Sequence, residues 1–339
     1  MKRLLAAAGA ALLGALMLVQ LAPGTSRDVS SHITARDARL TAEAHAAFIK
    51  DMSAHAPEVR TGKWASPGPL HTPGTKVGHG TLTSLPSVNW SGFADASATA
   101  GTFTRVSGNW ILPAVTCLPA PYQNQDAFIA NWVGIDGATD QTVEQLGTGA
   151  QCFEGVLYYY VWYEMYPSAT VQEGTLACIE DNVDCPQPGD RISASVTVKP
   201  GGNYTLSLTD YTTPGNNFTV SQSCAPSICL DESAEWVIER PATFIADGTL
   251  PQILPLVDFN RTGFFNGRLV ANGRPSSILG YHGTVYNIDM SDDFGAYYLD
   301  CVGQFEPPGT ILSVEPNQCP VVPPFFHGST FFATWDSSF

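Results

Sequence analysis

The feature that most constrains this chain is an alternation of apolar and polar residues, which begins near Leu85 and recurs in short runs. In the run 191–198 every second residue is apolar, and the turn sequence Pro-Gly-Gly-Asn at 200–203 leads into another alternating run. Alternate side chains of a strand point to opposite faces, so this pattern predicts a β-hairpin. Further strand-length runs lie at 102–112, 127–136, 141–146, 156–166, 234–240, 266–271 and 284–290. Many such runs, joined by Gly, Pro and Asn turns and with almost no helical stretch, predict an all-β sandwich of two antiparallel sheets.

The composition supports a folded domain and excludes one class of partner. Charged residues make up 14% of the chain and hydrophobic residues 44%, with 31 Gly and 25 Pro. This much apolar material needs burial, which excludes an intrinsically disordered chain. The net charge of −15 would repel phosphate groups, and no stripe of Lys and Arg offsets it. We therefore expect no nucleic acid partner.

The first 24 residues have the pattern of a secretory signal peptide. Lys2 and Arg3 precede an apolar run at 4–19, and Gly24 provides a small residue at the expected cleavage position. The alternative is an uncleaved anchor, but the run is shorter than the roughly 20 residues that a spanning helix needs. We expect a secreted, extracellular protein with no membrane partner after signal cleavage.

The cysteines agree with export. The chain has eight, an even number, all in its last two-thirds, and in an oxidising compartment such a set predicts disulfides. The expected pairs, two from closeness in the sequence and two by elimination, are Cys178–Cys185, Cys224–Cys229, Cys117–Cys152 and Cys301–Cys319. A zinc site is the alternative, but no Cys-x-x-Cys occurs and His is nearly absent from this region. We expect neither a metal nor another cofactor.

Charge divides the exported chain into two parts. Residues 26–82 carry seven Lys and Arg, five Asp and Glu, and five of the seven His, whereas residues 83–339 carry seven Lys and Arg against 26 Asp and Glu. Residues 35–54 have a modest amphipathic helical pattern, and 57–73 are rich in Pro and Gly. We expect a signal peptide at 1–24, a propeptide and linker at 25–82 that masks its own enzyme, and a β-sandwich domain at 83–339. A flexible stalk is the alternative for the second segment.

Several common catalytic signatures are absent from the sequence. There is no Gly-x-Ser-x-Gly, no His-Glu-x-x-His, and no Asp-Thr-Gly or Asp-Ser-Gly. Only His282 and His327 lie in the acidic domain, so a Ser-His-Asp triad has little support. Paired cysteines would also leave no thiol nucleophile.

Strand alternation predicts a face that carries carboxylates and aromatic rings. In three of the runs, alternate positions place acidic residues on one face, and two of these runs add large aromatic residues. The residues concerned are Trp132 and Asp136, then Tyr158, Tyr160, Trp162, Glu164 and Tyr166, then Glu235 and Glu239. A solvated outer face is the alternative for each strand alone. Together they indicate an acidic trough for an extended chain, either a polypeptide or a glycan.

A series of motifs then gives the sequence a family resemblance. In order they are Asn89-Trp90-Ser91-Gly92, Gly108-Asn109-Trp110-Ile111-Leu112-Pro113, Trp132-Val133-Gly134-Ile135-Asp136-Gly137, Glu144-Gln145-Leu146-Gly147, Trp162-Tyr163-Glu164-Met165-Tyr166-Pro167 and Ala234-Glu235-Trp236-Val237-Ile238-Glu239. Over roughly residues 88–240 the chain resembles the glutamic peptidases, or eqolisins. The resemblance implies a secreted, acid-acting endopeptidase with a concanavalin-like sandwich of two antiparallel sheets and a Gln and a Glu as catalytic pair.

The resemblance also implies roles for individual residues. Matched by motif, the catalytic pair falls on Gln145 and Glu239. The positions that bind substrate or support the pair fall on Trp132, Asp136, Trp162 and Glu164. Glu235 shares a strand face with Glu239, four residues earlier, and we expect it to have a supporting role. Met165 stands where Trp is common in the family, which would alter a subsite rather than the pair.

These residues predict a reaction that needs no metal. An ionised Glu239 would take a proton from water as the water attacks a peptide carbonyl, and Gln145 would hold that water and donate to the oxyanion. The expected partners are polypeptide substrates and the protein's own propeptide, and the expected state is a monomer. A glycan-binding or glycan-hydrolysing sandwich, or an inactive surface binding module, is the alternative function.

Overall fold

The computed structural model describes most of the region in which the strands were expected. The described residues are 75–77, 80–87, 89–118, 127–140, 142–153, 155–168, 170–174, 178, 184–225, 227–243, 252–290, 300–304 and 329–335. The expected signal peptide, the helical pattern at 35–54 and the Pro-rich linker lie outside the described residues. Among the described residues, no helix is both long and apolar enough to cross a membrane.

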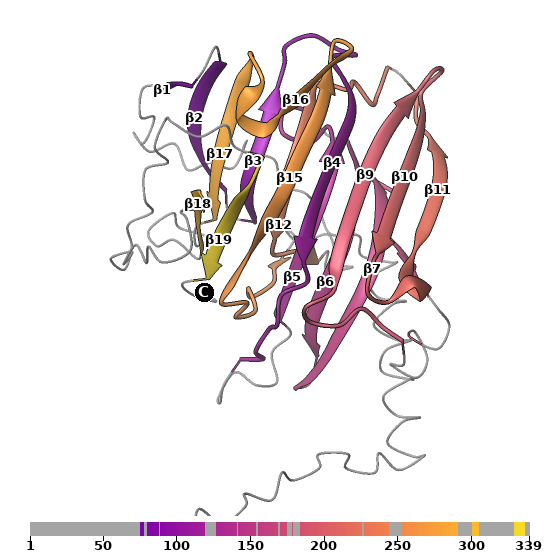
Figure 1. Ribbon diagram of the computed structural model, residues 1–339, viewed down its shortest axis with the longest axis vertical. Helices are drawn as coiled ribbons and strands as arrows, with labels where there is room; N and C mark the ends of the chain where they lie inside the picture. The colour runs from indigo at the N-terminus through magenta and orange to yellow at the C-terminus, as the bar shows by residue number, and fades with distance from the viewer. Residues whose placement is uncertain are drawn as a thin grey trace, which may run out of the picture.

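Most of the described residues belong to two large β-sheets stacked face to face (Figure 1). The nine-stranded sheet contains, in spatial order, β1 (Thr75–Val77), β2 (Gly80–Ser87), β17 (Thr284–Met290), β3 (Trp90–Ala96), β12 (Ser233–Glu239), β5 (Ala127–Ile135), β6 (Val143–Phe153), β7 (Val156–Tyr166) and β8 (Val171–Glu173). The eight-stranded sheet contains β11 (Phe218–Ser223), β10 (Asn203–Asp210), β9 (Arg191–Lys199), β4 (Phe103–Ile111), β15 (Arg261–Ala271), β19 (Phe331–Trp335) and β18 (Asp300–Gln304), with β16 (Arg274–Ser277) paired to β15. Two short strands, β13 (Ala242–Thr243) and β14 (Gln252–Ile253), pair with each other, and two single 3-10 turns lie at Pro214–Asn216 and Ile278–Gly280. The described residues therefore form the all-β sandwich that the alternation predicted.

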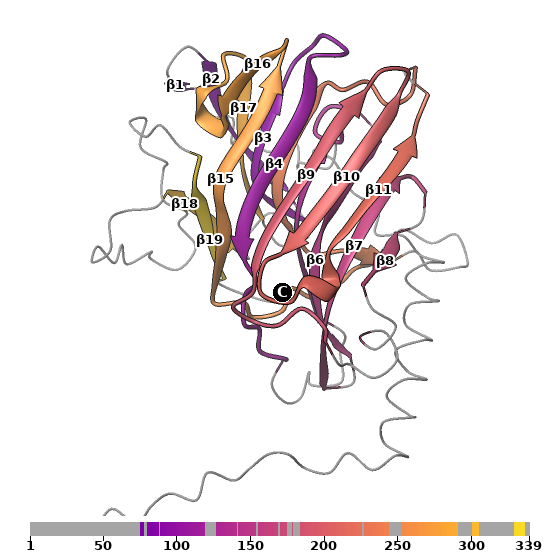
Figure 2. The ribbon, with the colours of Figure 1, turned by 45° about the vertical axis from the view of Figure 1, so that its right-hand side comes forward.

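The two sheets enclose one main core. Their inner faces contribute large buried side chains such as Trp110, Phe264, Trp236 and Leu146. In the oblique view of Figure 2, β9, β10 and β11 lie in front of β6, β7 and β8. A second buried cluster includes Trp132 and belongs only to the opposite face of the nine-stranded sheet. That second cluster shows that the outer face of this sheet is also covered by large side chains.

Most of the expected strands are confirmed, and the differences have local causes. The runs 156–166 and 284–290 are strands β7 and β17 with those limits, and the hairpin at 191–210 pairs in register as β9 and β10. The expected run 141–146 continues as β6 to Phe153, because Gly147 and Gly149 interrupt the apolar alternation without ending the strand. All described pairs are antiparallel in the two large sheets except β2 with β17, which is parallel.

Strand β2 bears on the expected division of the chain. It begins at Gly80 and pairs with seven residues of β17, so the boundary expected between residues 82 and 83 falls inside a strand. Leu82 packs against the main core. The processing position stays a prediction, but the sheet extends to its N-terminal side.

Three of the four expected disulfides are confirmed. Cys117 is bonded to Cys152, which ties the segment after β4 to β6. The other two are local, namely Cys178–Cys185 and Cys224–Cys229. The expected pair Cys301–Cys319 lies outside the residues whose side chains are described.

Candidate active site

The predicted site residues gather on one face of the nine-stranded sheet, which we call the site face. It is the face turned away from the eight-stranded sheet. In strands β12, β5, β6 and β7, alternate residues belong to the main core and the residues between them belong to the site face. Because these four strands pair directly, their register places the site residues in transverse rows. Three such rows contain most of the predicted site.

The first row contains the predicted catalytic glutamine. Glu235, Gly134, Gln145 and Glu164 are consecutive partners across β12, β5, β6 and β7. The Nε2 atom of Gln145 donates a hydrogen bond of 2.7 Å to Oε2 of Glu164. Both side chains are buried. Glu164 therefore fixes the orientation of the Gln145 amide. Its supporting role in catalysis stays a prediction.

The second row contains the two predicted tryptophans, with a glycine between them. Val237, Trp132, Gly147 and Trp162 are consecutive partners across the same strands. A Cβ added at Gly147 would overlap the carbonyl oxygen of Asn131 and the side chain of Trp132. Only glycine allows β6 to lie this close to Trp132, and the same closeness lets Trp132 extend along the site face toward the third row.

The third row contains the predicted catalytic glutamate. Glu239, Ala130, Gly149 and Tyr160 are consecutive partners. The Nε1 atom of Trp132 donates a hydrogen bond of 2.7 Å to Oε2 of Glu239, whose side chain is buried. Burial raises the pKa of Glu239 to about 8, although hydrogen bonds from its neighbours act in the opposite direction.

Sequence reasoning missed the second partner of Glu239. The Nδ2 atom of Asn89 donates to Oε1 of Glu239 at 3.4 Å, and the hydroxyl of Ser87 donates to Oδ1 of Asn89 at 3.2 Å. The Ser87 hydroxyl also accepts the backbone N–H of Trp90. The motif Asn89-Trp90-Ser91-Gly92 was noticed in the sequence, but the alternation of a single strand gave no signal that its first residue would contact a residue 150 positions later.

The structure separates Glu235 from Glu239, although both lie on the site face. Burial is the main cause that raises the pKa of Glu235, and the neighbouring charges of Asp136 and Asp140 raise it further. Glu239 instead contacts Trp132 and Asn89. Glu235 thus belongs electrostatically to an acidic group at the end of the sheet, and its expected supporting role stays a prediction.

Asp136 anchors that acidic group. It lies one residue beyond β5 with a φ of 68°, so strand alternation no longer determines where it points. Its two carboxylate oxygens accept the backbone N–H groups of Asp231 and Glu232 at 2.8 and 2.7 Å. These bonds fix the segment that leads into β12, the strand that carries Glu239. The expected role of Asp136 in supporting the catalytic pair stays a prediction.

Among the described residues, three carboxylates of this group lie close enough together to hold a metal ion. Oxygens of Asp136, Glu144 and Asp231 lie within 4.8 Å of one another. The hydroxyl of Tyr204 donates to Asp231 at 2.7 Å. Burial and neighbouring carboxylates raise the pKa of Asp136 to about 7 and that of Glu144 well above its usual value. This arrangement favours carboxyl groups that keep their protons.

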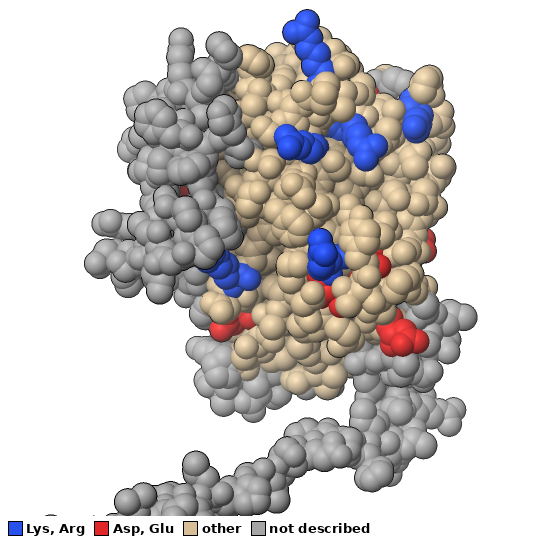
Figure 3. Space-filling view, in the orientation of Figure 1, with Lys and Arg blue, Asp and Glu red and all other residues tan. Residues whose placement is uncertain are grey.

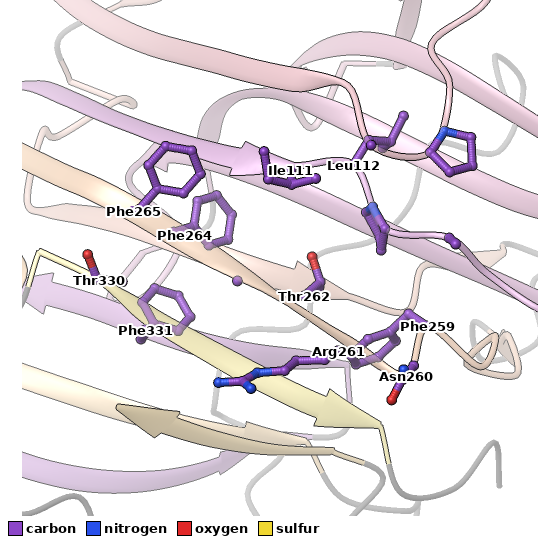
Figure 4. A pocket seen from close by; sticks show the side chains of 15 residues that line it. Ile111, Leu112, Phe259, Asn260, Arg261, Thr262, Phe264, Phe265, Thr330 and Phe331 are labelled. Carbon is purple, nitrogen blue, oxygen red and sulfur yellow. The ribbon is translucent and has the colours of Figure 1, made fainter. Parts of the chain in front are cut away.

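A separate hollow lies in the eight-stranded sheet (Figure 4). Its volume is about 990 Å³, and its lining comes from the first residues of β15 and from the segments that follow β4 and precede β9, β15 and β19. The aromatic side chains of Phe259, Phe264, Phe265 and Phe331 point around it, with Arg261 at one side. None of the predicted site residues lines this hollow.

The chain is similar to a set of known proteins in both sequence and fold. A family model described as the Peptidase A4 family matches residues 88–301. No curated protein sequence matches the chain. Among solved structures, scytalido-glutamic peptidase with a transition-state-analogue inhibitor aligns with a TM-score of 0.52 and 22% identity, over 74% of this chain and 98% of that one. SCP-B, described as a member of the eqolisin family of peptidases in complex with the tripeptide Ala-Ile-His, aligns with a TM-score of 0.50 and 21% identity, again over 74% and 98%. The structural likeness establishes the shared sandwich fold.

Proposed function

Because the chain belongs to the Peptidase A4 family, it is a peptide hydrolase of the glutamic type, and we propose that Gln145 and Glu239 carry out the reaction. The observation that carries this proposal is the environment of Glu239. Its carboxylate is held from one side by Trp132 and from the other by Asn89, on the same face of the sheet as the Gln145–Glu164 pair. The carboxylate of Glu239 is fixed by two hydrogen-bond donors, and the neighbouring site-face positions of β6 are the glycines Gly147 and Gly149. Such a glutamate is suited to act on a bound peptide.

In this proposal Glu239 is the general base. It removes a proton from water as the water oxygen bonds to the peptide carbonyl carbon, and it later returns that proton to the leaving amine. Gln145 has a second N–H beyond the one that Glu164 accepts, and this N–H can donate to the carbonyl oxygen as it becomes an oxyanion. Among the described residues no donor reaches Oε1 of Gln145, so this oxygen can accept from the attacking water.

The pKa of Glu239 sets a condition on activity in acid. With a pKa raised to about 8 by burial, the closed site keeps Glu239 protonated at low pH. General-base catalysis there requires water to reach the carboxylate, which restores its hydration and moves the pKa back toward the usual value near 4.3. The hydrogen bonds from Trp132 and Asn89 favour the ionised form and assist this change. We propose acid-active hydrolysis on this basis.

We also propose that the enzyme is secreted as a pro-form, with residues 25–82 as the propeptide. Three disulfides among the described residues fit an oxidising compartment. A purified pro-form stepped from pH 7 to pH 3.5 should cleave itself, and Glu239→Gln should not. Processing of the Glu239→Gln pro-form at the wild-type rate would show that self-activation is wrong.

The dyad is tested by paired substitutions assayed on denatured protein at pH 3.5. Glu239→Gln should abolish hydrolysis and leave the melting temperature close to that of the wild type. Glu235→Gln should be milder, because Glu235 is associated with the acidic group around Asp136. Pepstatin should have no effect on the wild type, and polysaccharides should not be cleaved. If Glu235→Gln is inactive and Glu239→Gln is active, the choice between the two glutamates is wrong, and if both are active the glutamic mechanism fails.

A further inference from the structure

The carboxyl group of Glu144 is completely buried and accepts no hydrogen bond. The residue is 0% exposed, and neither Oε1 nor Oε2 has a donor. Glu144 lies on β6 two residues before the core residue Leu146, so its side chain points from the nine-stranded sheet toward the eight-stranded sheet. Burying a carboxylate without a donor or a cation is costly, so a partner is expected beside it.

Two further carboxylates meet Glu144 at this place. One oxygen each from Asp136, Glu144 and Asp231 lie within 4.8 Å of one another. The three residues come from separate segments, because Asp136 follows β5, Glu144 belongs to β6 and Asp231 precedes β12. The hydroxyl of Tyr204, on β10 of the other sheet, donates to Asp231 at 2.7 Å. The oxygens therefore gather where both sheets and the segment leading into β12 come together.

No basic side chain balances the charge of this group. With Asp140 and Glu235 it contains five acidic residues, and among the described residues none of the five forms an ion pair with Lys or Arg. Asp136 and Glu144 lie close enough to share a proton. One shared proton neutralises a single charge, whereas a divalent cation neutralises two and also supplies the partner that the Glu144 oxygens lack.

The spacing of the three oxygens suits calcium. Calcium binds carboxylate oxygens at about 2.3–2.6 Å, so two ligands of one ion lie up to about 5 Å apart, and the observed spacing requires no movement of the chain. Magnesium, with bonds of about 2.0–2.1 Å, needs closer oxygens in a near-ideal octahedron. The two Asp136 oxygens accept the backbone N–H groups of Asp231 and Glu232, and each keeps a second lone pair for a cation.

We propose that Asp136, Glu144 and Asp231 form a calcium site that ties β5 and β6 to the segment before β12. The ion binds the carboxylate oxygens and displaces any protons that they carry into the solvent. The sequence predicted no metal, because the three residues come together only through the fold. The site is distinct from the Gln145–Glu239 pair, and its role is to hold the start of the strand that carries Glu239.

Terbium(III) tests the site directly, because it replaces calcium at oxygen ligands and luminesces when a nearby aromatic ring, here that of Tyr204, is excited. The full chain, freed of metal with EDTA and held at pH 7.5, should show terbium luminescence that added calcium abolishes. Calcium at 10 mM should raise the melting temperature by about 3 °C or more if the dissociation constant is about 1 mM. Magnesium at the same concentration should give less than about half of this shift.

Glu144→Gln is the decisive variant, because it keeps the shape of the side chain and removes the ligand charge. It should lose both the terbium luminescence and the shift in melting temperature caused by calcium. Glu173→Gln makes the same chemical change on β8, outside the acidic group, and should retain both. Asp231→Asn, at a partly exposed position, provides the same test if Glu144→Gln does not fold.

Three results would overturn the proposal. The first is a wild-type protein that shows neither terbium luminescence nor a response of its melting temperature to calcium. The second is a calcium response that the Glu144→Gln or Asp231→Asn protein retains in full, because the ion would then bind elsewhere on the acidic protein. The third is an equal shift with magnesium, which would refute the assignment to calcium. None of these measurements uses hydrolysis, so they are independent of the Gln145–Glu239 proposal.

Discussion

At the scale of single residues, the site depends on opposing influences on one carboxyl group. Burial raises the pKa of Glu239, and hydrogen bonds that include the one from Trp132 lower it. A hydrogen bond to a charged group is worth about 1.5–3 kcal/mol, or one to two pKa units. In the proposed mechanism, Trp132 therefore helps to set the lowest pH at which Glu239 can act as a base.

Trp132→Phe should move the acidic limb of the kcat/KM profile upward by about one pH unit. Removing the Nε1 donor destabilises the ionised form of Glu239, so a higher pH is needed to obtain the same fraction of base. The profile should be measured from pH 2.5 to 7 on a synthetic peptide. Trp162→Phe is the control, because Trp132 rather than Trp162 donates to Glu239. A limb that stays in place in Trp132→Phe would show that this hydrogen bond does not set the pKa of the base.

At the scale of elements, β6 is the strand whose residues give the candidate site its shape. It carries Gln145 and, at the next two site-face positions, Gly147 and Gly149. Each glycine makes room for an aromatic side chain, Trp132 in one case and Tyr160 in the other. The strand thereby brings aromatic groups from both of its neighbours to lie over its own backbone.

Gly147→Ala should cost both stability and activity. The added Cβ would meet the backbone carbonyl of Asn131, which cannot rotate away, so β5 and β6 must separate locally. Overpacking of this kind costs about 1–3 kcal/mol, which corresponds to a fall of roughly 3–10 °C in Tm for a domain of this size. Thr197→Ala, on the outer side of β9, is the control and should leave both properties nearly unchanged. A Gly147→Ala enzyme with wild-type Tm and kcat would contradict the close approach described here.

The strands and the site face could be foreseen from the sequence because they depend on alternation within single segments. The alternation of successive side chains along a strand directly predicted the limits of β7 and the face that Trp162 and Glu164 share. What could not be foreseen depends on register between segments distant in the chain. Asn89 lies beside Glu239 only because β3 pairs with β12, and Tyr160 shares a row with Glu239 only once β12, β5, β6 and β7 are aligned. The position of Asp136 also could not be predicted from alternation. Its positive φ ends the strand pattern that had placed it on the same face as Trp132.

At the scale of the whole molecule, the acidic charge is not only a surface property. Figure 3 shows scattered basic side chains and few acidic ones on the face that it views. Many carboxyl residues are instead buried, namely Asp95, Asp136, Glu144, Glu164, Asp190, Asp210, Glu235, Glu239 and Asp289. Repulsion between exposed carboxylates, which screening by salt would weaken, is therefore only part of the effect of pH on stability.

The folded domain should be most stable in acid and lose stability as the pH rises through about 7 to 8. The folded-state pKa values of Asp136 and Glu239 are raised to about 7 and about 8, above the values near 4 expected in the unfolded chain. Folding thus favours the protonated groups, so their contribution is complete below about pH 4 and disappears as the pH passes the raised values. For Asp136 alone it is on the order of 4 kcal/mol, which corresponds to roughly 10 °C in Tm.

Melting temperatures at pH 4 and pH 8, each at low and high salt, test this expectation. The loss at pH 8 should persist in high salt, because buried groups are screened little. Asp136→Asn should reduce the difference between the two pH values, because the amide does not titrate. A domain that is more stable at pH 8 than at pH 4 would contradict the prediction.

The disulfide between Cys224 and Cys229 has a consequence for self-cleavage, in which one molecule of a peptidase cuts another. Their Cα atoms are 6.0 Å apart, whereas five extended residue steps would span about 17 Å. A peptide that binds along a face made of strands has to be extended. The segment closed by the Cys224–Cys229 disulfide cannot extend. We therefore expect the loop just before β12, the strand that carries Glu239, to resist cleavage by neighbouring copies of the enzyme.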